Sequence, residues 1–278
     1  MLYNFQKDAV IGAIQKIEMY GGCIIADSVG LGKTFEALAV MKYYQLRNDR
    51  ILVLAPKKLR ENWTVYQAQN NSPLNPFVND RFAFTVLSHT DLSRDGGRSG
   101  DIDLATINWG NYDLVVIDES HNFRNNTKGR RDEAGQVVRM SRYERLMEEI
   151  IKAGIQTRVL LLSATPVNNR LADLKNQIAF VTEGDDTALV EHGIDSIEQT
   201  TRKAQIQFNR WLTMDEAERT PGHLVEMLGF DYFTLLDHLT IARSRRHIER
   251  YYGTDETCLL YTSPSPRDRT RSRMPSSA

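Results

Sequence analysis

Between residues 23 and 34 the chain reads Cys-Ile-Ile-Ala-Asp-Ser-Val-Gly-Leu-Gly-Lys-Thr. The apolar start of this stretch predicts a buried strand, and the apolar spacing from Lys33 to Tyr44 predicts a helix directly after the loop. The loop fits the template G-x-x-x-x-G-K-[ST] at its last three residues, whereas Asp27 stands at the position of the first glycine. The stretch predicts a phosphate-binding loop, with an incidental Gly-rich turn as the alternative.

The residue types in this loop suit a nucleotide. Gly30 and Gly32 allow backbone N–H groups to turn toward an anion, and the N-terminus of the following helix adds a positive dipole end. We expect Lys33 to neutralise the β- and γ-phosphates and the Thr34 hydroxyl to ligate Mg²⁺. The full set of expected nucleotide contacts in the loop is Asp27, Ser28, Val29, Gly30, Leu31, Gly32, Lys33 and Thr34.

Apolar runs alternate with helix-like stretches over the first 182 residues. Further strands are predicted at Ile51–Ala55, Phe84–Leu87, Leu114–Ile117 and Arg158–Leu162, with helices near 59–68 and 171–180. This alternation predicts an α/β fold with a mostly parallel sheet and helices on both faces. From about residue 183 to 252 no further strand is expected, and the pattern there is helical.

Two adjacent carboxylates, Asp118 and Glu119, follow the strand at 114–117. Ligands of open α/β sheets bind outside the carboxyl ends of the strands, and a turning strand end lets both side chains reach one site. We expect Asp118 to hold Mg²⁺, and Glu119 to orient and deprotonate the attacking water. The alternative is a solvated strand end without a function.

These motifs, together with Leu162-Ser-Ala-Thr-Pro-Val-Asn168, resemble the first motor lobe of helicase superfamily two, and most of all the Swi/Snf-type DNA-dependent ATPases. The resemblance covers about residues 2–250. In that family Asp is usual where Asp27 stands, and Ser28 replaces a usual Glu. The resemblance implies a RecA-like lobe that binds ATP and Mg²⁺, contacts the backbone of duplex DNA without reading its sequence, and works with a second lobe of the same polypeptide.

The resemblance also assigns roles to residues outside the phosphate loop. It implies an adenine contact for Gln6, catalytic roles for Lys33, Asp118 and Glu119, and DNA contacts for Lys57 and Lys58. Asp118-Glu-Ser-His121 resembles the family's D-E-x-H box and is called here the DESH box, or acidic box. His121 is expected at the nucleotide–DNA interface, and Ser163 and Thr165 are expected to couple the ATP state to lobe movement. Each role has an alternative. Gln6 could be a surface residue near a helix start, His121 could cap a helix or pack in the core, and Ser163 and Thr165 could simply end a strand.

The residue pattern also bears on Trp63 and on a basic stretch at 124–142. Trp63 shares a helical stripe with Leu59 and Tyr66, so we expect it in the core. The basic stretch at 124–142 follows the acidic box directly, and it either contacts DNA or forms a mobile loop.

The expected organisation is an ATP-binding lobe at 1–182, a helical extension at 183–257 that leads toward a second lobe absent from the sequence, and a non-native tail at 258–278. Two other functions stay open: a regulatory nucleotide-binding module without motor action, and the motor part of a restriction or defence nuclease system. On this view the fragment by itself is close to inactive as an ATPase.

The tail carries four arginines and one aspartate, a net of +3, which leaves −4 for residues 1–257 of a chain whose total is −1. Residues 258–268 and 272–278 resemble, in one reading frame, the translation of a transposase-type sequencing-library adaptor and the flow-cell sequence that follows it. We therefore expect the tail to be adaptor-derived and disordered, and its arginines are left out of any DNA-binding argument.

The overall composition argues against a membrane protein and against a secreted, disulfide-rich protein. The chain has 278 residues, of which 41% are hydrophobic and 26% charged, and no apolar run approaches 18 residues, so no membrane span is expected. Cys23 and Cys258 have no framework spacing, and the N-terminus shows no signal-peptide pattern. We expect a cytoplasmic, prokaryotic protein.

Overall fold

The computed structural model describes residues 2–67, 75, 77–154, 156–164 and 171–253. Its centre is a six-stranded sheet of order β10-β1-β9-β6-β2-β3, in which every neighbouring pair is parallel. The strands are β1 (Gly22–Ile25), β2 (Ile51–Ala55), β3 (Thr85–Ser88), β6 (Leu114–Asp118), β9 (Arg158–Leu162) and β10 (Thr240–Ile241). The α/β class and the parallel sheet predicted from the sequence are confirmed.

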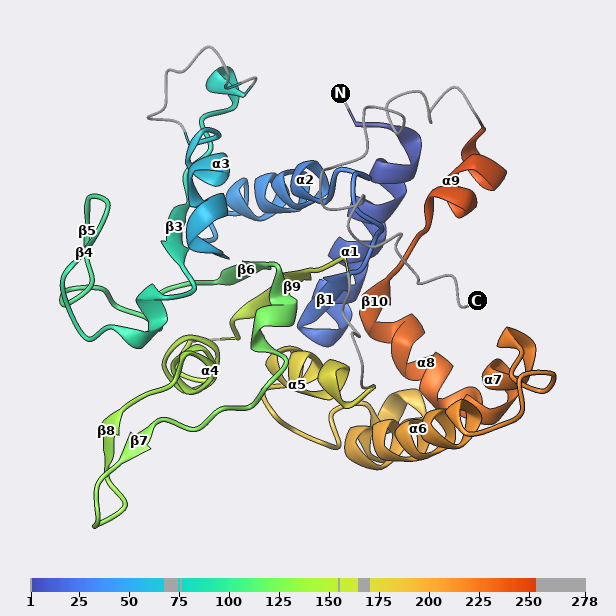
Figure 1. The fold of residues 1–278 in the computed structure, drawn as a ribbon. Coiled ribbons are helices and arrows are strands. Elements are labelled where there is room, and N and C mark those ends of the chain that lie inside the picture. Colours follow the sequence, from blue (N-terminus) through green and yellow to red (C-terminus); the bar gives the residue numbers. More distant parts are fainter. Residues whose placement is uncertain (1, 68–74, 76, 155, 165–170, 254–278) are drawn as a thin grey trace, which may run out of the picture.

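Helices cover both faces of this sheet (Figure 1). One face carries α1 (Asn4–Tyr20), α2 (Lys33–Gln45) and α3 (Arg60–Thr64). The other carries α4 (Arg142–Glu144) with its π-helical continuation at Arg145–Ile151, α5 (Ala172–Val181) and α8 (Phe230–Leu239). Alternate residues along a strand enter the two cores: Ile24 joins the α5–α8 side, whereas Cys23 and Ile25 join the α1–α2 side. This burial on both faces explains why the strands are continuously apolar.

The stretch after residue 183 is mainly helical. It contains α6 (Ile197–Leu212), α7 (Pro221–Leu228), α8 and α9 (Arg245–Tyr252). The expectation that no further strand follows residue 183 is wrong at β10, which pairs with β1 through Ile24–Thr240 and Ile25–Ile241. A two-residue strand is too short to show a period in sequence, and only its partner on the sheet edge defines it.

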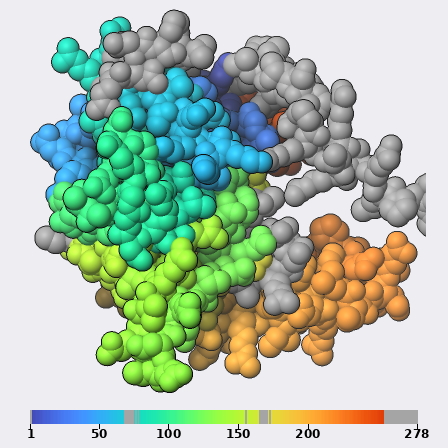
Figure 2. Space-filling view, turned by 60° about the vertical axis from the view of Figure 1, so that its left-hand side comes forward, coloured from blue at the N-terminus to red at the C-terminus, as the bar shows by residue number. Residues whose placement is uncertain are grey.

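Two small antiparallel hairpins lie outside the main sheet. One pairs β4 (Arg98–Ser99) with β5 (Ile102–Asp103), and the other pairs β7 (Arg130–Arg131) with β8 (Val137–Arg139). The β7–β8 hairpin holds part of the basic stretch and projects from the body of the molecule in both views (Figures 1 and 2). Short 3₁₀ turns lie at Lys57–Leu59, Val78–Asp80, Asp91–Ser93, Ser120–Phe123 and Val190–His192.

Within the described ranges, no helix combines the length and the apolar character that crossing a membrane requires.

Candidate nucleotide-binding site

The phosphate loop connects β1 to α2 at the carboxyl edge of the sheet. Gly30 and Gly32 have φ angles of 87° and 86°, in the left-handed region that favours glycine. A Cβ at Gly32 would lie 2.4 Å from Nε2 of Gln6, so the Gln6 amide would have to move to admit a larger residue. The backbone conformation of the loop therefore favours glycine at both positions, and α2 begins immediately afterwards at Lys33.

The Lys33 side chain folds along this loop. Its Nζ donates hydrogen bonds to the carbonyls of Asp27 at 2.7 Å and Ser28 at 3.4 Å. Burial lowers the pKa of the Lys33 ammonium, and the nearby carboxylates, Glu119 and Asp118 among them, oppose that shift. The ammonium therefore lies in the electrostatic field of the acidic strand end, as a shared phosphate site requires.

Gln6 lies on the first turn of α1 and is only 6% exposed. Its Nε2 donates to the carbonyl of Leu31 at 3.0 Å, and its Oε1 accepts from the backbone N–H of Tyr3 at 3.1 Å. The surface glutamine considered as the alternative is thus excluded by burial. Gln6 joins α1 to the phosphate loop, while its adenine contact stays a prediction.

The acidic strand end turns sharply. Glu119 adopts φ 50° and ψ 51°, a left-handed conformation that is costly for a residue with a Cβ. This turn interrupts the strand alternation, as anticipated, so the two adjacent carboxylates are not held on opposite faces of the sheet. Asp118 accepts a hydrogen bond from the Glu119 backbone N–H at 2.9 Å, and burial raises the pKa of its carboxyl.

A series of polar contacts connects Glu119 to the end of β9. Oε2 of Glu119 lies 3.2 Å from Nδ1 of His121, and the hydroxyl of Ser163, just past β9, lies 3.5 Å from the same nitrogen. Ser163 is fully buried and its backbone N–H donates to the carbonyl of Ile25. The structure therefore brings three of the expected site residues together, whereas Thr165 lies outside the described residues.

The segment expected to face DNA follows β2. Lys57 and Lys58 are both exposed on a 3₁₀ turn, and Trp63, one turn further, is 1% exposed, which confirms its predicted core position. One contact of Trp63 was not predicted: its indole N–H donates to Oδ2 of Asp118 at 3.0 Å. The helical stripe signals burial, but nothing local in the sequence signals this partner.

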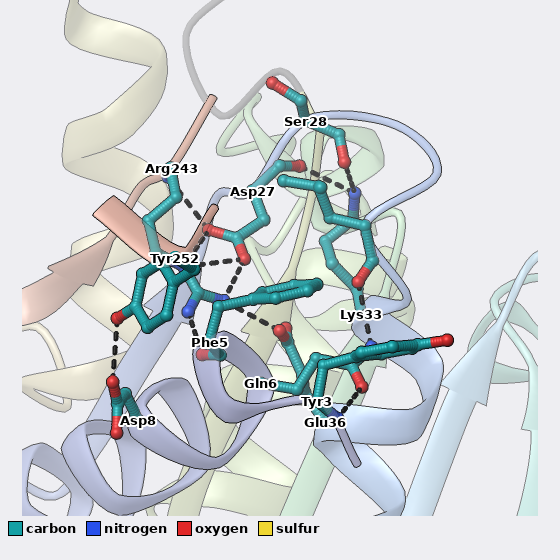
Figure 3. Close-up of polar contacts among 11 residues, drawn as sticks. Tyr3, Phe5, Gln6, Asp8, Asp27, Ser28, Lys33, Glu36, Arg243 and Tyr252 are labelled. Atoms are coloured by element: carbon teal, nitrogen blue, oxygen red, sulfur yellow. Dashed lines mark hydrogen bonds and ion pairs between the residues drawn. The ribbon is translucent and has the colours of Figure 1, made fainter. Parts of the chain in front are cut away.

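Arg243 is a second residue whose place in the site was not predicted: the stretch at 241–246 resembles the family's arginine-bearing segment that leads toward the second lobe, but this gave Arg243 no role at the phosphate loop. Its side chain enters the base of the phosphate loop and forms ion pairs with Asp27 and Glu36 (Figure 3). The available signal was indirect, because a buried aspartate in place of glycine needs a counter-charge.

Comparisons with known proteins agree with this geometry. The family model described as "Type III restriction enzyme, res subunit" matches residues 1–168. The chain is 30% identical to "Uncharacterized ATP-dependent helicase YqhH" of Bacillus subtilis over 175 residues, which are 60% of this chain and 27% of that protein. It is 31% identical to the Xenopus laevis "SWI/SNF-related matrix-associated actin-dependent regulator of chromatin subfamily A-like protein 1" over 185 residues, which are 65% of this chain and 17% of that one.

Among solved structures, the "Sulfolobus solfataricus SWI2/SNF2 ATPase core in complex with dsDNA" matches with a TM-score of 0.56 at 18% identity, over 88% of this chain and 45% of that one. This match shows the fold. The chain thus spans less than a third of the two relatives named above. It belongs to the family of the Type III restriction enzyme res subunit, and its fold is similar to that of the Sulfolobus solfataricus SWI2/SNF2 ATPase core.

Proposed function

We propose that this chain is the ATP-binding lobe of a DNA-dependent ATPase that translocates on DNA. The observation that carries the proposal is the convergence of two motifs at one sheet edge: the phosphate loop follows β1, and Asp118 and Glu119 lie at the end of β6, with only the parallel strand β9 between them. The same carboxylates oppose the lowering of the Lys33 pKa by burial. Gln6 closes the same site from α1 through its bond to Leu31. A solvated strand end or an incidental Gly-rich turn would not require this arrangement.

The residues of the site fit a nucleotide with Mg²⁺. The loop offers backbone N–H groups beside two left-handed glycines and a helix N-terminus, which together favour phosphate. Among the described residues no group of three or more His, Cys, Asp or Glu side chains is arranged to hold a metal by itself. This agrees with a cation held by few protein groups together with phosphate oxygens, and Thr34 and Asp118 are the groups that we assign.

Each catalytic side chain then has one task. Lys33 provides the positive charge that offsets phosphate, and Mg²⁺ when bound polarises the same phosphates. Glu119 is the base that orients water and accepts its proton, and His121 at 3.2 Å fixes the position of that carboxylate. Ser163 links His121 to the end of β9, from which we propose that the nucleotide state is transmitted.

DNA contact is proposed at two exposed basic features. The first is Lys57 and Lys58 on the turn after β2. The second, here called the basic patch, is a set of exposed cations around the β7–β8 hairpin whose side chains form neither an ion pair nor a hydrogen bond with any described residue: Lys128, Arg130 and Arg142. Such groups bind phosphates without reading base sequence, so the interaction should weaken steeply with salt.

Turnover by this chain alone should be slow. The described residues hold one parallel sheet, and the resemblance implies that arginine fingers come from a second lobe. Such fingers contribute about 10³–10⁵ in rate. The proposal is therefore tested first by binding, and hydrolysis is measured on the full-length protein with and without duplex DNA.

The binding test titrates a fluorescent ATP analogue with Mg²⁺ into the chain and into Lys33→Ala. Lys42→Ala is the matched control, because Lys42 lies on the same helix but contacts the carbonyl of Asp80 and the ring of Phe82. We expect loss of binding in Lys33→Ala and unchanged affinity in the control. Equal affinity of the chain and Lys33→Ala, or no binding by either, contradicts the proposal.

A second candidate is the motor part of a restriction system, favoured by the description of the family model that matches residues 1–168. It shares the ATPase chemistry and differs in the attached activity. Sequencing the neighbouring genes and assaying the full complex for ATP-dependent DNA cleavage separates the two. Cleavage products would favour this candidate, and translocation without cleavage the first.

A further inference from the structure

We propose that Arg243 is the positioning residue of the phosphate loop: it holds the two ends of the loop together and thereby sets nucleotide affinity. The inference rests on the proposed nucleotide binding at this loop and adds a residue from 216 positions further along the chain than Asp27.

Backbone contacts first bring the distant segment to the loop. β10 extends the sheet beside β1, and the pairing continues past the strand ends. The N–H of Ala26 donates to the carbonyl of Ile241 at 2.6 Å, and the N–H of Ser28 donates to that of Arg243 at 3.0 Å. The loop therefore leaves the sheet alongside the segment that carries Arg243.

The Arg243 guanidinium then contacts both ends of the loop (Figure 3). Its Nε lies 3.0 Å from Oδ2 of Asp27, the first residue of the loop, and its Nη2 lies 2.7 Å from Oε1 of Glu36 on the first turn of α2. Nη2 also pairs with Asp27, and Nη1 donates to the carbonyl of Phe5 on α1. One planar group thus joins the strand end, the helix start and α1, which a lysine cannot do with a single nitrogen.

The ion pairs of Arg243 are buried, so their loss would not be compensated by water. The side chains of Asp27 and Glu36 are fully buried, and that of Arg243 is 9% exposed. Arg243 supplies the only ion pair that either carboxyl group makes with a described residue, and Glu36 Oε2 has no hydrogen-bond partner among those residues. Burial and Asp27 already raise the pKa of Glu36 to about 8, so without the guanidinium Glu36 would take up a proton and the link between the two ends of the loop would be lost.

Neighbouring contacts support the same role. Arg245 donates to the carbonyl of Val29 at 3.0 Å, within the loop itself. Ile248 of α9 packs with Leu31 of the loop and Phe5 of α1 in a small apolar cluster. The segment from 243 to 248 therefore contacts the loop at its start, middle and end, and Arg243 is its buried member.

The test compares Arg243→Met and Arg243→Lys with Arg246→Met as the matched control. Arg246 lies three residues further on, is exposed, and has no hydrogen bond or ion pair with the part of the chain that the structure describes. Binding of the fluorescent ATP analogue with Mg²⁺ is titrated at a temperature at which circular dichroism shows every variant folded. Because Arg243→Met removes the charge-assisted hydrogen bonds that join the two ends of the loop, the affinity for the analogue should fall about tenfold or more.

Arg243→Lys keeps the charge but not the fork, so it should lose affinity by a smaller factor, while Arg246→Met stays within about twofold of the parent. If Arg243→Met does not fold, Arg243→Lys decides. Folded variants at Arg243 that bind within about twofold of the parent overturn the inference and leave the proposed function intact, since they assign Arg243 to stability alone. A parent chain that does not bind the analogue overturns both.

Discussion

Replacing Trp63 by Phe removes one hydrogen-bond donor from beside the acidic strand end and keeps an aromatic ring in place. Trp63 is 1% exposed, and its indole N–H donates to Oδ2 of Asp118 at 3.0 Å. A hydrogen bond to a charged group contributes about 1.5–3 kcal/mol. The smaller ring adds a packing loss of about 1–2 kcal/mol, so the free energy of unfolding should fall by about 2.5–5 kcal/mol in total.

A double-mutant cycle separates these two contributions. Urea unfolding is followed by circular dichroism at pH 7 for the parent, Trp63→Phe, Asp118→Ala and the double variant. In the Asp118→Ala background, Trp63→Phe removes only packing, so the coupling energy should be about 1.5–3 kcal/mol. Trp211→Phe is the control, because the indole of Trp211 donates to the carbonyl of Thr220 at an exposed site and its loss should cost less than about 1 kcal/mol.

A coupling energy below about 0.5 kcal/mol would refute the reasoning, since independent sites add to within that margin. The indole contact would then have no energetic content. A coupling energy in the expected range would show that the Trp63–Asp118 contact links the short helix after the Lys57–Lys58 turn energetically to the carboxylate that we assign to Mg²⁺. The nucleotide affinity of Trp63→Phe should then fall as well.

Three further predictions rest on single features of the structure. Burial lowers the pKa of His89 to about 4, so protonation of this imidazole is penalised in the folded state. The free energy of unfolding should stay constant above pH 6.5 and fall by about 3 kcal/mol toward pH 4. In urea unfolding measured across this pH range, His89→Gln should lose most of that fall, and identical pH profiles for the parent and the variant would refute the lowered pKa of His89. Gly32→Ala forces a side chain into a left-handed site beside Gln6 and should cost about 2 kcal/mol or more, while the open helical site Gly222→Ala should cost nothing in the same thermal unfolding assay. Replacing the basic patch by Gln should reduce the salt slope of duplex-DNA binding by about 3 in fluorescence anisotropy, and an unchanged slope removes the patch from the interface.

The strands of the fold were the most predictable part. β2 and β9 have the bounds read from the apolar runs, because a strand buried on both faces leaves a continuous signal. β10 was missed because two residues carry no period. The paired carboxylates predict a turn at Glu119, yet the sequence does not indicate that this turn is left-handed.

In the candidate site, too, the features that are local in sequence were predictable and the long-range contacts were not. The phosphate loop, the acidic box and Gln6 follow from motifs whose residues are close in sequence or fixed in order. The partners of Asp27 and Asp118 were not predictable, since Arg243 and Trp63 lie 216 and 55 positions away from them. Such pairings depend on which segments the sheet brings together, and no local pattern records them.

The pairing of β10 with β1 changes how the two halves of the chain relate. The expected lobe at residues 1–182 supplies five strands of the sheet, and the sixth comes from the helical stretch that follows. That sixth strand also delivers Arg243, the counter-charge of the aspartate that replaces glycine in the loop. The departure from the phosphate-loop template is therefore tolerated because a distant segment compensates for it. In physical terms the loop is completed not by residues 27–34 alone but by those residues together with 240–248.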